Sequence, residues 1–237
     1  MSGALQKLSL QITPNPSDLC CICGREIVVP EDSPLRQENS ATWKCPDCER
    51  SVAEKIAARK KSEIESSRNK FLDQVPVSFR RTERGKLPFP EKLDAALNWN
   101  FGSRGLLLFG PTGCGKSRVI WEVAKREIGK GIKVRCLSAY ELIRYPAMFM
   151  AGDDAAGKFA EELVEAQLLL LDDVFKAKPT ERIEELLFTV IDERGAWERP
   201  CLITLNDTGS TLEARLSSDR GPALIRRLRE HCQVIQF

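Results

Sequence analysis

Eight consecutive residues have the types and the spacing needed to hold phosphate groups. They read GPTGCGKS and match the P-loop pattern G-x-x-x-x-G-K-[ST]. The glycines let backbone N–H groups turn toward phosphate oxygens at the start of a helix. Lys116 can place its charge on the β- and γ-phosphates, and Ser117 can offer its hydroxyl to Mg²⁺. We therefore predict that a nucleotide is bound by Gly110, Pro111, Thr112, Gly113, Cys114, Gly115, Lys116 and Ser117.

Two adjacent carboxylates follow an apolar run further along the chain. Residues 168–171 are four leucines, and Asp172 and Asp173 come directly after them. An apolar strand that ends in acidic residues is the expected partner of a P-loop, the Walker B element. We predict that Asp172 joins Ser117 in holding Mg²⁺ and that Asp173 orients or activates the attacking water. The alternative is a buried strand that ends in a polar turn.

Five of the nine cysteines lie close together near the N-terminus. Cys20 and Cys23 form one C-x-x-C pair, and Cys45 and Cys48 form a second. Two such pairs are typical of a tetrahedral zinc site, in which four thiolates leave no open position for water. Cys21 is a rival ligand, but equal spacing in the two pairs favours Cys20. A disulfide is the alternative, and a reducing compartment argues against it.

The zinc-binding module is short, so a metal would supply most of its stability. We expect a hairpin between the cysteine pairs, over residues 26–29 and 41–44, and a surface that the module presents to a partner. The chain then divides into a flexible N-terminus (1–17), the zinc-binding module (18–50), a connecting helix (51–75) and a nucleotide-binding domain (76–237).

The connecting helix has an unusually polar sequence. Residues 47–73 are rich in Ala, Glu, Lys and Arg and contain no Gly or Pro, which favours a solvated helix. Its basic residues Lys55, Arg59, Lys60 and Lys61 are candidates for contact with nucleic acid. A solvated face is the preferred interpretation.

Composition limits the class of protein. The 237 residues carry a formal net charge of +2, which does not mark the whole chain as a nucleic-acid binder. No segment approaches the ~18 apolar residues of a membrane span, and the N-terminus lacks the apolar core of a secretory signal. We expect a cytoplasmic protein with reduced thiols and no membrane partner.

The hydrophobic pattern predicts the elements that position the candidate site. Apolar runs predict strands over 106–109, 134–137, 168–171, 200–205 and 233–237. Helical spacing predicts helices over 92–98, 119–128, 139–147, 157–166, 181–194, 211–216 and 223–230. Gly129 and Gly195 are expected to end two of them. Strands that alternate with helices indicate an α/β fold, with a parallel five-stranded sheet covered on both faces.

Three stretches together resemble a known family. GPTGCGKS, LLLLDDV and LITLND, followed by GPALIRRLRE and a last strand, are similar to the AAA+ ATPases over residues 76–237. The resemblance is closest to helicase loaders of the DnaC/DnaI type and to the IstB-type transposition helpers. An N-terminal cysteine module ahead of such a core is also similar to the DnaI arrangement.

The resemblance implies roles for two further residues. Asn206, at the end of a strand beside Walker B, occupies the sensor position that reads the γ-phosphate or holds the water. Arg227 matches the arginine finger, which reaches a nucleotide held by a neighbouring subunit. Arg226, one position away, is the alternative finger. An ordinary strand-ending Asn and a solvated Arg are the plain alternatives.

Two features depart from the wider superfamily. Walker B reads Asp172-Asp173, where most members have Asp-Glu, so the expected turnover is slow. The sequence stops at Phe237, straight after the last strand, so we expect no C-terminal helical lid. The nucleotide should then be more open to solvent, and assembly should depend more on partners.

The resemblance implies a function in DNA replication. The first hypothesis is an ATP-dependent factor that loads the replicative DNA helicase onto single-stranded DNA, with hydrolysis of ATP as an assembly switch. The chain would use ATP, Mg²⁺ and Zn²⁺ and form a homo-oligomer when ATP is bound. The second hypothesis is an IstB-like transposition helper that binds duplex DNA. The third is a nucleotide-binding adaptor that hydrolyses little ATP.

Overall fold

The computed structural model describes residues 19–25, 27, 44–150, 154–175, 179–206 and 209–237. The chain divides into two compact units, Met1–Glu63 and Ile64–Phe237. The flexible N-terminus predicted over 1–17 and most of the predicted hairpin lie outside the described residues.

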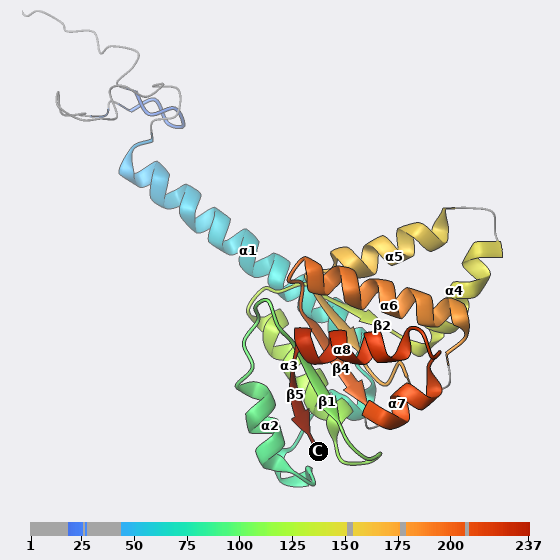
Figure 1. Ribbon diagram of the computed structural model, residues 1–237. Coiled ribbons are helices and arrows are strands. Elements are labelled where there is room, and N and C mark those ends of the chain that lie inside the picture. The colour runs from blue at the N-terminus through green and yellow to red at the C-terminus, as the bar shows by residue number, and fades with distance from the viewer. Residues whose placement is uncertain (1–18, 26, 28–43, 151–153, 176–178, 207–208) are drawn as a thin grey trace, which may run out of the picture. The chain divides into compact units, whose positions relative to one another are not determined.

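Helix α1, Pro46–Gln74, labelled in Figure 1, has exposed side chains along most of its length. It confirms the helix predicted over 47–73. Phe71, near its end, is its buried residue. Arg59 pairs with Glu63 at 2.9 Å, an i,i+4 contact that stabilises an exposed helix surface. The basic residues of the candidate nucleic-acid face are all exposed, which is compatible with both interpretations: Lys55, Arg59, Lys60 and Lys61.

The second unit is built on a five-stranded sheet with the order β2-β3-β4-β1-β5. Every strand pair in it is parallel, which confirms the predicted α/β fold. Because β4 lies between β1 and β3, the strands that precede the P-loop and the acidic pair are one strand apart. The strands are β1 (Gly105–Phe109), β2 (Val134–Leu137), β3 (Leu168–Leu171), β4 (Cys201–Leu205) and β5 (Cys232–Gln236).

Helices cover both faces of this sheet, as its apolar strands require. Leu106 and Leu108 pack with α2, α3 and the end of α1. Leu107, between them in sequence, packs with the other helices on the opposite face. The helices are α2 (Pro90–Leu97), α3 (Lys116–Gly129), α4 (Ala139–Met150), α5 (Ala155–Glu165), α6 (Glu181–Ala196), α7 (Gly209–Arg215) and α8 (Gly221–His231). Two 3-10 turns, η4 (Val77–Phe79) and η5 (Arg84–Lys86), join α1 to α2.

Gly129 and Gly195 were each expected to end a helix, and the two predictions have different outcomes. Helix α3 ends at Gly129, as predicted. Helix α6 continues through Gly195 to Ala196, so the prediction that Gly195 closes this helix is wrong. A Cβ atom at Gly195 would lie 2.3 Å from the ring of His231 at the end of α8. Gly195 therefore permits two helices to approach closely.

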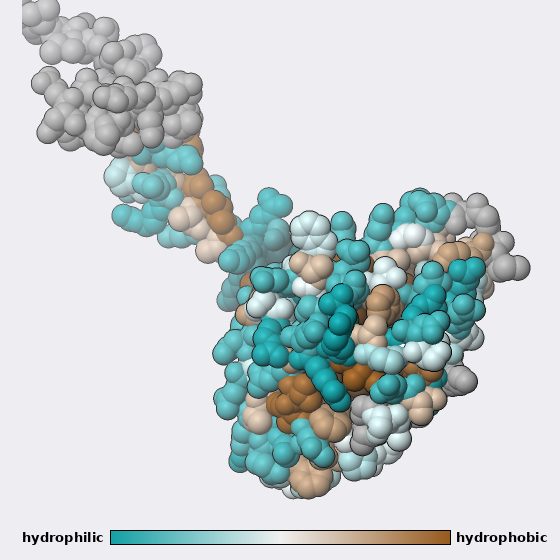
Figure 2. Space-filling model, in the orientation of Figure 1, coloured by the Kyte–Doolittle hydropathy of each residue, from teal (hydrophilic) through white to brown (hydrophobic). Residues whose placement is uncertain are grey.

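The surface of the second unit is mostly hydrophilic on the face seen in Figure 2, with smaller hydrophobic areas between the polar ones. Among the residues that the structure describes, no helix has the length and apolar character needed to cross a membrane.

Candidate functional site

The P-loop joins the end of β1 to the start of α3, as the motif requires. Three of its residues have positive φ angles that favour glycine: Gly110 (149°), Gly113 (84°) and Gly115 (95°). A Cβ atom at Gly110 would lie 2.6 Å from the carbonyl oxygen of Phe237. Among the described residues, no side chain caps the N-terminus of α3. Its first N–H groups are therefore available to an anion.

Lys116 is almost fully buried, with 4% of its surface exposed. Its Nζ donates hydrogen bonds to the carbonyl oxygens of Gly110, at 2.9 Å, and Pro111, at 2.8 Å. The same atom lies 3.5 Å from Sγ of Cys114. The ammonium group thus ties the loop together from inside, and phosphate binding would exchange these bonds for contacts with phosphate oxygens. Ser117, the next residue, is half-buried in the first turn of α3.

Asp172 follows β3 and accepts hydrogen bonds on both carboxylate oxygens. Its Oδ1 accepts from the hydroxyl of Thr204 at 2.7 Å, and its Oδ2 accepts from the indole Nε1 of Trp121 at 2.9 Å. Thr204 lies in β4 and Trp121 in α3, so the carboxylate is held from two elements. Both donors are buried, which strengthens bonds to a charged acceptor.

Asp173 has a left-handed backbone, with φ at 56°. Its backbone N–H donates to the Thr204 hydroxyl oxygen at 2.8 Å, and its Oδ1 accepts from Nδ2 of Asn206. The structure therefore brings together Asp173 and Asn206, which were predicted from separate parts of the sequence. Both belong to the carboxyl edge of the sheet, where ligands of open α/β sheets bind.

Two residues of this site, Thr204 and Trp121, were not predicted from the sequence. Thr204 contacts both aspartates, and a signal for it existed, because it is the polar residue inside the apolar strand CLITL. Trp121 lies among the apolar residues of α3, and nothing in its spacing indicates a bond to Asp172.

The two candidate finger arginines have different surroundings within the chain. Arg227 forms ion pairs with Asp192 of α6 and with Glu230, the latter at 3.4 Å, and its side chain is 33% exposed. Arg226 is 63% exposed and lies 3.8 Å from Glu230. Both arginines thus contact Glu230, and the contact with Asp192 of α6 is made by Arg227.

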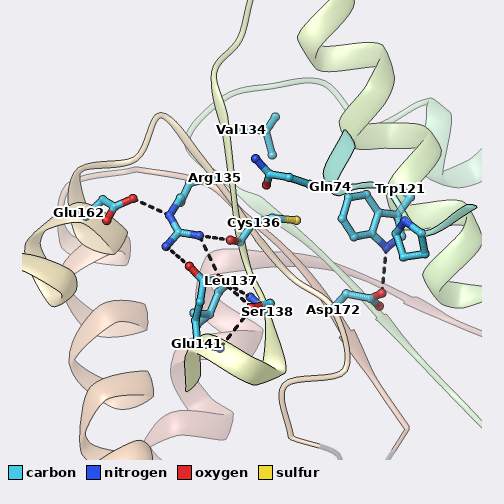
Figure 3. Close-up of a pocket in the computed structure, with 11 residues that line it drawn as sticks. Gln74, Trp121, Val134, Arg135, Cys136, Leu137, Ser138, Glu141, Glu162 and Asp172 are labelled. Atoms are coloured by element: carbon cyan, nitrogen blue, oxygen red, sulfur yellow. Dashed lines mark hydrogen bonds and ion pairs between the residues drawn. The ribbon is translucent and has the colours of Figure 1, made fainter. Parts of the chain in front are cut away.

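Two cavities meet at Asp172. The larger, about 840 Å³, runs beside β2 and is also lined by Trp121 and Gln74. In it, Arg135 lies between Glu141 and Glu162, with a 2.6 Å ion pair to each (Figure 3). Partial burial alone would raise the pKa of Glu141, but Arg135 and Ser138 hold that pKa below its ordinary value.

The second cavity, about 510 Å³, has a mostly apolar lining and includes both aspartates. Its other walls come from α4, from the segment after β3 and from the start of α6: Ala139, Leu142, Ile143, Pro146, Val174, Pro179, Thr180 and Ile183.

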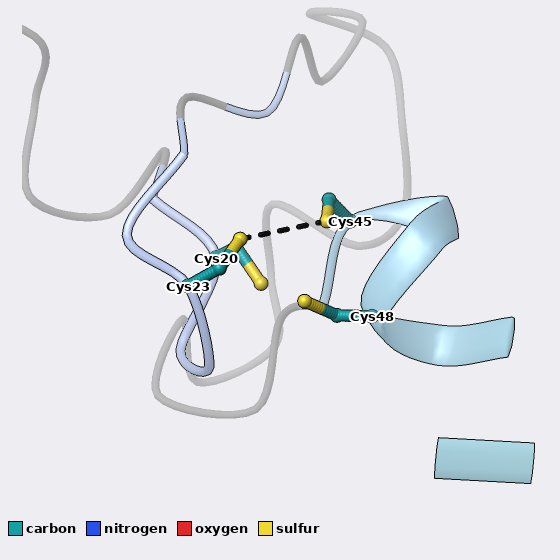
Figure 4. Close-up of side chains that lie close together, drawn as sticks. All are labelled: Cys20, Cys23, Cys45 and Cys48. Atoms are coloured by element: carbon teal, nitrogen blue, oxygen red, sulfur yellow. Dashed lines mark hydrogen bonds between the residues drawn. The ribbon is translucent and has the colours of Figure 1, made fainter. Parts of the chain in front are cut away.

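The four cysteines predicted to bind zinc form a cluster in the first unit (Figure 4). Their Sγ atoms all lie within 4.8 Å of one another, and those of Cys23 and Cys45 are 3.7 Å apart. Four thiolates at the Zn–S distance of about 2.3 Å, in a tetrahedron, lie about 3.8 Å apart, so the donor set fits Zn²⁺. Cys21 is exposed and is not part of the cluster.

Local backbone structure supports the cluster. Gly24 has φ at 69°, and its N–H donates to the carbonyl oxygen of Cys20 at 2.9 Å, which closes a turn that contains the first pair. Hydrogen bonds from the backbone of Cys23 and Cys45 lower the pKa of Cys20 to about 6. A hydrogen bond to Cys23, together with burial, raises the pKa of Cys48 to about 12. A bound cation would favour the thiolate form of every member.

This fold and this site define an ATP-binding protein of the AAA+ type. The sequence model of the IstB-like ATP binding protein family matches residues 91–237. The chain belongs to that family. No curated protein sequence matches it.

Solved structures with the same fold come from DNA replication proteins. DnaI is 16% identical, with a TM-score of 0.53, over 69% of this chain and 88% of DnaI. A structure described as a primosome component, from Streptococcus pyogenes, is 17% identical, with a TM-score of 0.51, over 69% of this chain and 89% of its own.

DnaA has the same fold within a longer chain. DnaA bound to AMPPCP and single-stranded DNA is 19% identical, with a TM-score of 0.51, over 62% of this chain. The match spans 44% of that DnaA chain and 47% of DnaA from Aquifex aeolicus, so it covers about half of DnaA. At these identities the comparison establishes the fold.

Proposed function

We propose that this protein is an ATP-dependent DNA replication factor that loads the replicative helicase onto single-stranded DNA. One observation carries the proposal: a P-loop, a doubly held Asp172 and the Asp173–Asn206 pair occupy the carboxyl ends of three neighbouring strands. This arrangement fits the binding and hydrolysis of ATP. Similarity in fold to DnaI and to a primosome component supports a role in replication.

The proposed reaction converts ATP and water to ADP and phosphate and acts as a switch on assembly. Lys116 and the loop N–H groups bind the phosphates. Ser117 and Asp172 would hold Mg²⁺, which neutralises phosphate charge when bound. Asp173 orients the water, and Asn206 fixes Asp173 through its hydrogen bond.

The arginine finger acts between subunits in this proposal. Within the chain, Arg227 is paired with Asp192 and Glu230. A neighbouring nucleotide would have to compete with those carboxylates, which would keep hydrolysis slow until subunits assemble. Arg226 is more exposed and remains the alternative finger.

The cysteine module is proposed to bind one Zn²⁺ through Cys20, Cys23, Cys45 and Cys48 and to grip the replicative helicase. The four thiolates would close the metal's coordination sphere, so the metal has a structural role.

Helix α4 offers a surface suited to single-stranded DNA. Tyr140 is 68% exposed and Ile143 is 72% exposed. The guanidinium of Arg144 lies 5.5 Å from the centre of the Tyr140 ring. Aromatic rings that stack on bases, with arginines beside them, are a common way to bind single strands. Tyr140→Ala should weaken binding of an oligonucleotide about tenfold, whereas Trp197→Ala, which removes another exposed aromatic side chain, should not.

The decisive experiment is a pull-down with the replicative helicase of the same organism, followed by a loading assay on circular single-stranded DNA. Capture of the helicase and ATP-dependent loading are expected from the wild-type chain. Lys116→Ala should capture the helicase without the ATP-dependent step. Failure to capture the helicase in the presence of ATP and zinc would contradict the proposal.

A second candidate is a transposition helper, favoured by the IstB-like family match over residues 91–237. This candidate predicts a preference for duplex over single-stranded DNA and capture of a transposase in place of the helicase. A nucleotide-binding adaptor is distinguished by turnover: it would bind ATP and release no phosphate above background.

A further inference from the structure

The buried indole N–H of Trp121 donates its hydrogen bond to a charged side chain. Only 5% of its surface is exposed, so the N–H needs a protein acceptor. That acceptor is the charged carboxylate of Asp172, at 2.9 Å. The other buried tryptophan of the unit, Trp99, is 3% exposed and donates to a backbone carbonyl, that of Arg104, at 3.0 Å. The two residues thus make the same kind of bond to acceptors of different charge.

The bond restricts the orientation of the Asp172 carboxylate. The Thr204 hydroxyl donates to one oxygen and Trp121 to the other, from two separate elements. Each oxygen keeps a second lone pair, which leaves room for a metal ion or a metal-bound water. Partners of this kind orient the ligands of metal sites and contribute to metal affinity.

Trp121 is itself held by Phe71, in the last turns of α1. The two ring centres are 5.4 Å apart and the planes are tilted by 43°. Phe71 is 3% exposed. The cavity of about 840 Å³ lies beside the indole (Figure 3). The Phe71 ring is the aromatic contact of Trp121 within the packed cluster around it.

We propose that Trp121 is a positioning residue for the magnesium ligand Asp172, and that Phe71 holds Trp121 in the orientation this task requires. The inference deepens the proposed ATPase function and rests on it. Through Trp121 it links the end of α1 to the Asp172 carboxylate, although the sequence pattern of α1 indicates only a solvated connector.

The test compares Trp121→Phe with Trp99→Phe in the full-length protein. Both variants remove one buried indole N–H and keep an aromatic ring, but only Trp121→Phe frees an oxygen of Asp172. The free Mg²⁺ concentration at half-maximal ATP turnover should rise about tenfold in Trp121→Phe. It should stay unchanged in Trp99→Phe, and calorimetry should show the same contrast between the two variants in the Mg²⁺ dependence of ATP binding.

A second variant separates positioning from general stability. Phe71→Leu keeps the buried apolar contact but removes the ring that packs on Trp121, so its Mg²⁺ requirement should rise less than that of Trp121→Phe. If the wild type releases no phosphate, the same comparison is made on Mg²⁺-dependent ATP binding by calorimetry. That outcome contradicts hydrolysis but still tests Trp121. A Mg²⁺ dependence of Trp121→Phe equal to that of Trp99→Phe would overturn the inference.

Discussion

The nucleotide site and the cysteine cluster are held together by different forces. The nucleotide site lies where strands buried on both faces end, and side chains such as Thr204 are fixed by the packed unit around them. In the first unit, by contrast, Cys20 and Cys45 are the buried residues among those the structure describes. One site is a product of a folded core, whereas the described residues around the other bury almost no apolar side chains.

The two sites should therefore respond differently to the loss of their ligands, a nucleotide in one and a metal ion in the other. Burial of apolar side chains holds the second unit together whether or not a nucleotide is bound. We expect the cysteine cluster to depend on a bound metal, because the described residues around it bury little surface and the free energy of metal binding would then be the free energy of folding.

Loss of one thiolate should unfold the first unit and leave the second intact. We expect about one zinc per chain in the wild type and none in Cys45→Ser, because structural zinc contributes about 10–16 kcal/mol to such modules. Metal analysis and hydrogen exchange measure the two effects, and ATP binding should be unchanged. Cys21→Ser, which alters the exposed cysteine outside the cluster, is the control. A metal-free protein with a protected cysteine module would contradict the contrast.

Lys116→Ala should have the opposite effect to Cys45→Ser, with ATP binding lost and zinc retained. The variant removes the ammonium charge that would face the phosphates. It also removes the hydrogen bonds from Lys116 to the carbonyl oxygens of Gly110 and Pro111. We expect affinity to fall at least about 100-fold, measured by calorimetry, since bonds to charged groups contribute about 1.5–3 kcal/mol each. Lys130→Ala, at the other end of α3 and paired with Glu127, should bind ATP normally. Normal ATP affinity in Lys116→Ala would show that the P-loop is assigned wrongly.

Arg227→Ala should leave ATP affinity intact and reduce turnover, by up to about 10³-fold if it is the trans finger. Mixing it with Lys116→Ala should restore activity, because each variant supplies what its neighbour lacks. Arg226→Ala is the matched comparison, because its side chain is the more exposed of the two. No rescue at any ratio, with both variants folded and associated, would argue that the site is complete within one chain.

Asp173→Asn should allow ATP to bind and then trap it. Loss of the carboxylate that orients the water should slow hydrolysis about 100-fold, and single-turnover kinetics would measure the step directly. The backbone N–H at position 173 can still donate to the Thr204 hydroxyl oxygen in this variant, so the fold of the second unit should be unaffected. Hydrolysis at the wild-type rate would remove Asp173 from the mechanism.

The strands and the P-loop could be predicted because their signals are local. A run such as Leu106–Leu108 has to be buried on both faces, and a parallel sheet between helices provides that environment. The glycines of the P-loop are needed for their own backbone angles, so no distant contact decides the motif.

The remaining parts depend on contacts between distant segments. Gly195 follows an amphipathic pattern. A glycine in that place can either end the helix or allow another helix to pack closely, and the sequence does not distinguish the two. The contact with His231 of α8 shows the second role. Trp121, in α3, carries no sign of its bond to Asp172, because that partner follows β3 and is distant in sequence. The ion pair of Arg227 with Asp192 likewise appears only when α6 and α8 pack together.

The left-handed backbone of Asp173 also limits which substitutions evolution can accept at that position. Asp and Asn tolerate this conformation better than longer side chains, because their short polar groups can bond to nearby backbone. A single change to Glu would add strain to a turn that Thr204 already fixes. A lineage that carries this acidic pair would therefore need to rebuild the turn before it could adopt the Asp-Glu pair of the wider superfamily.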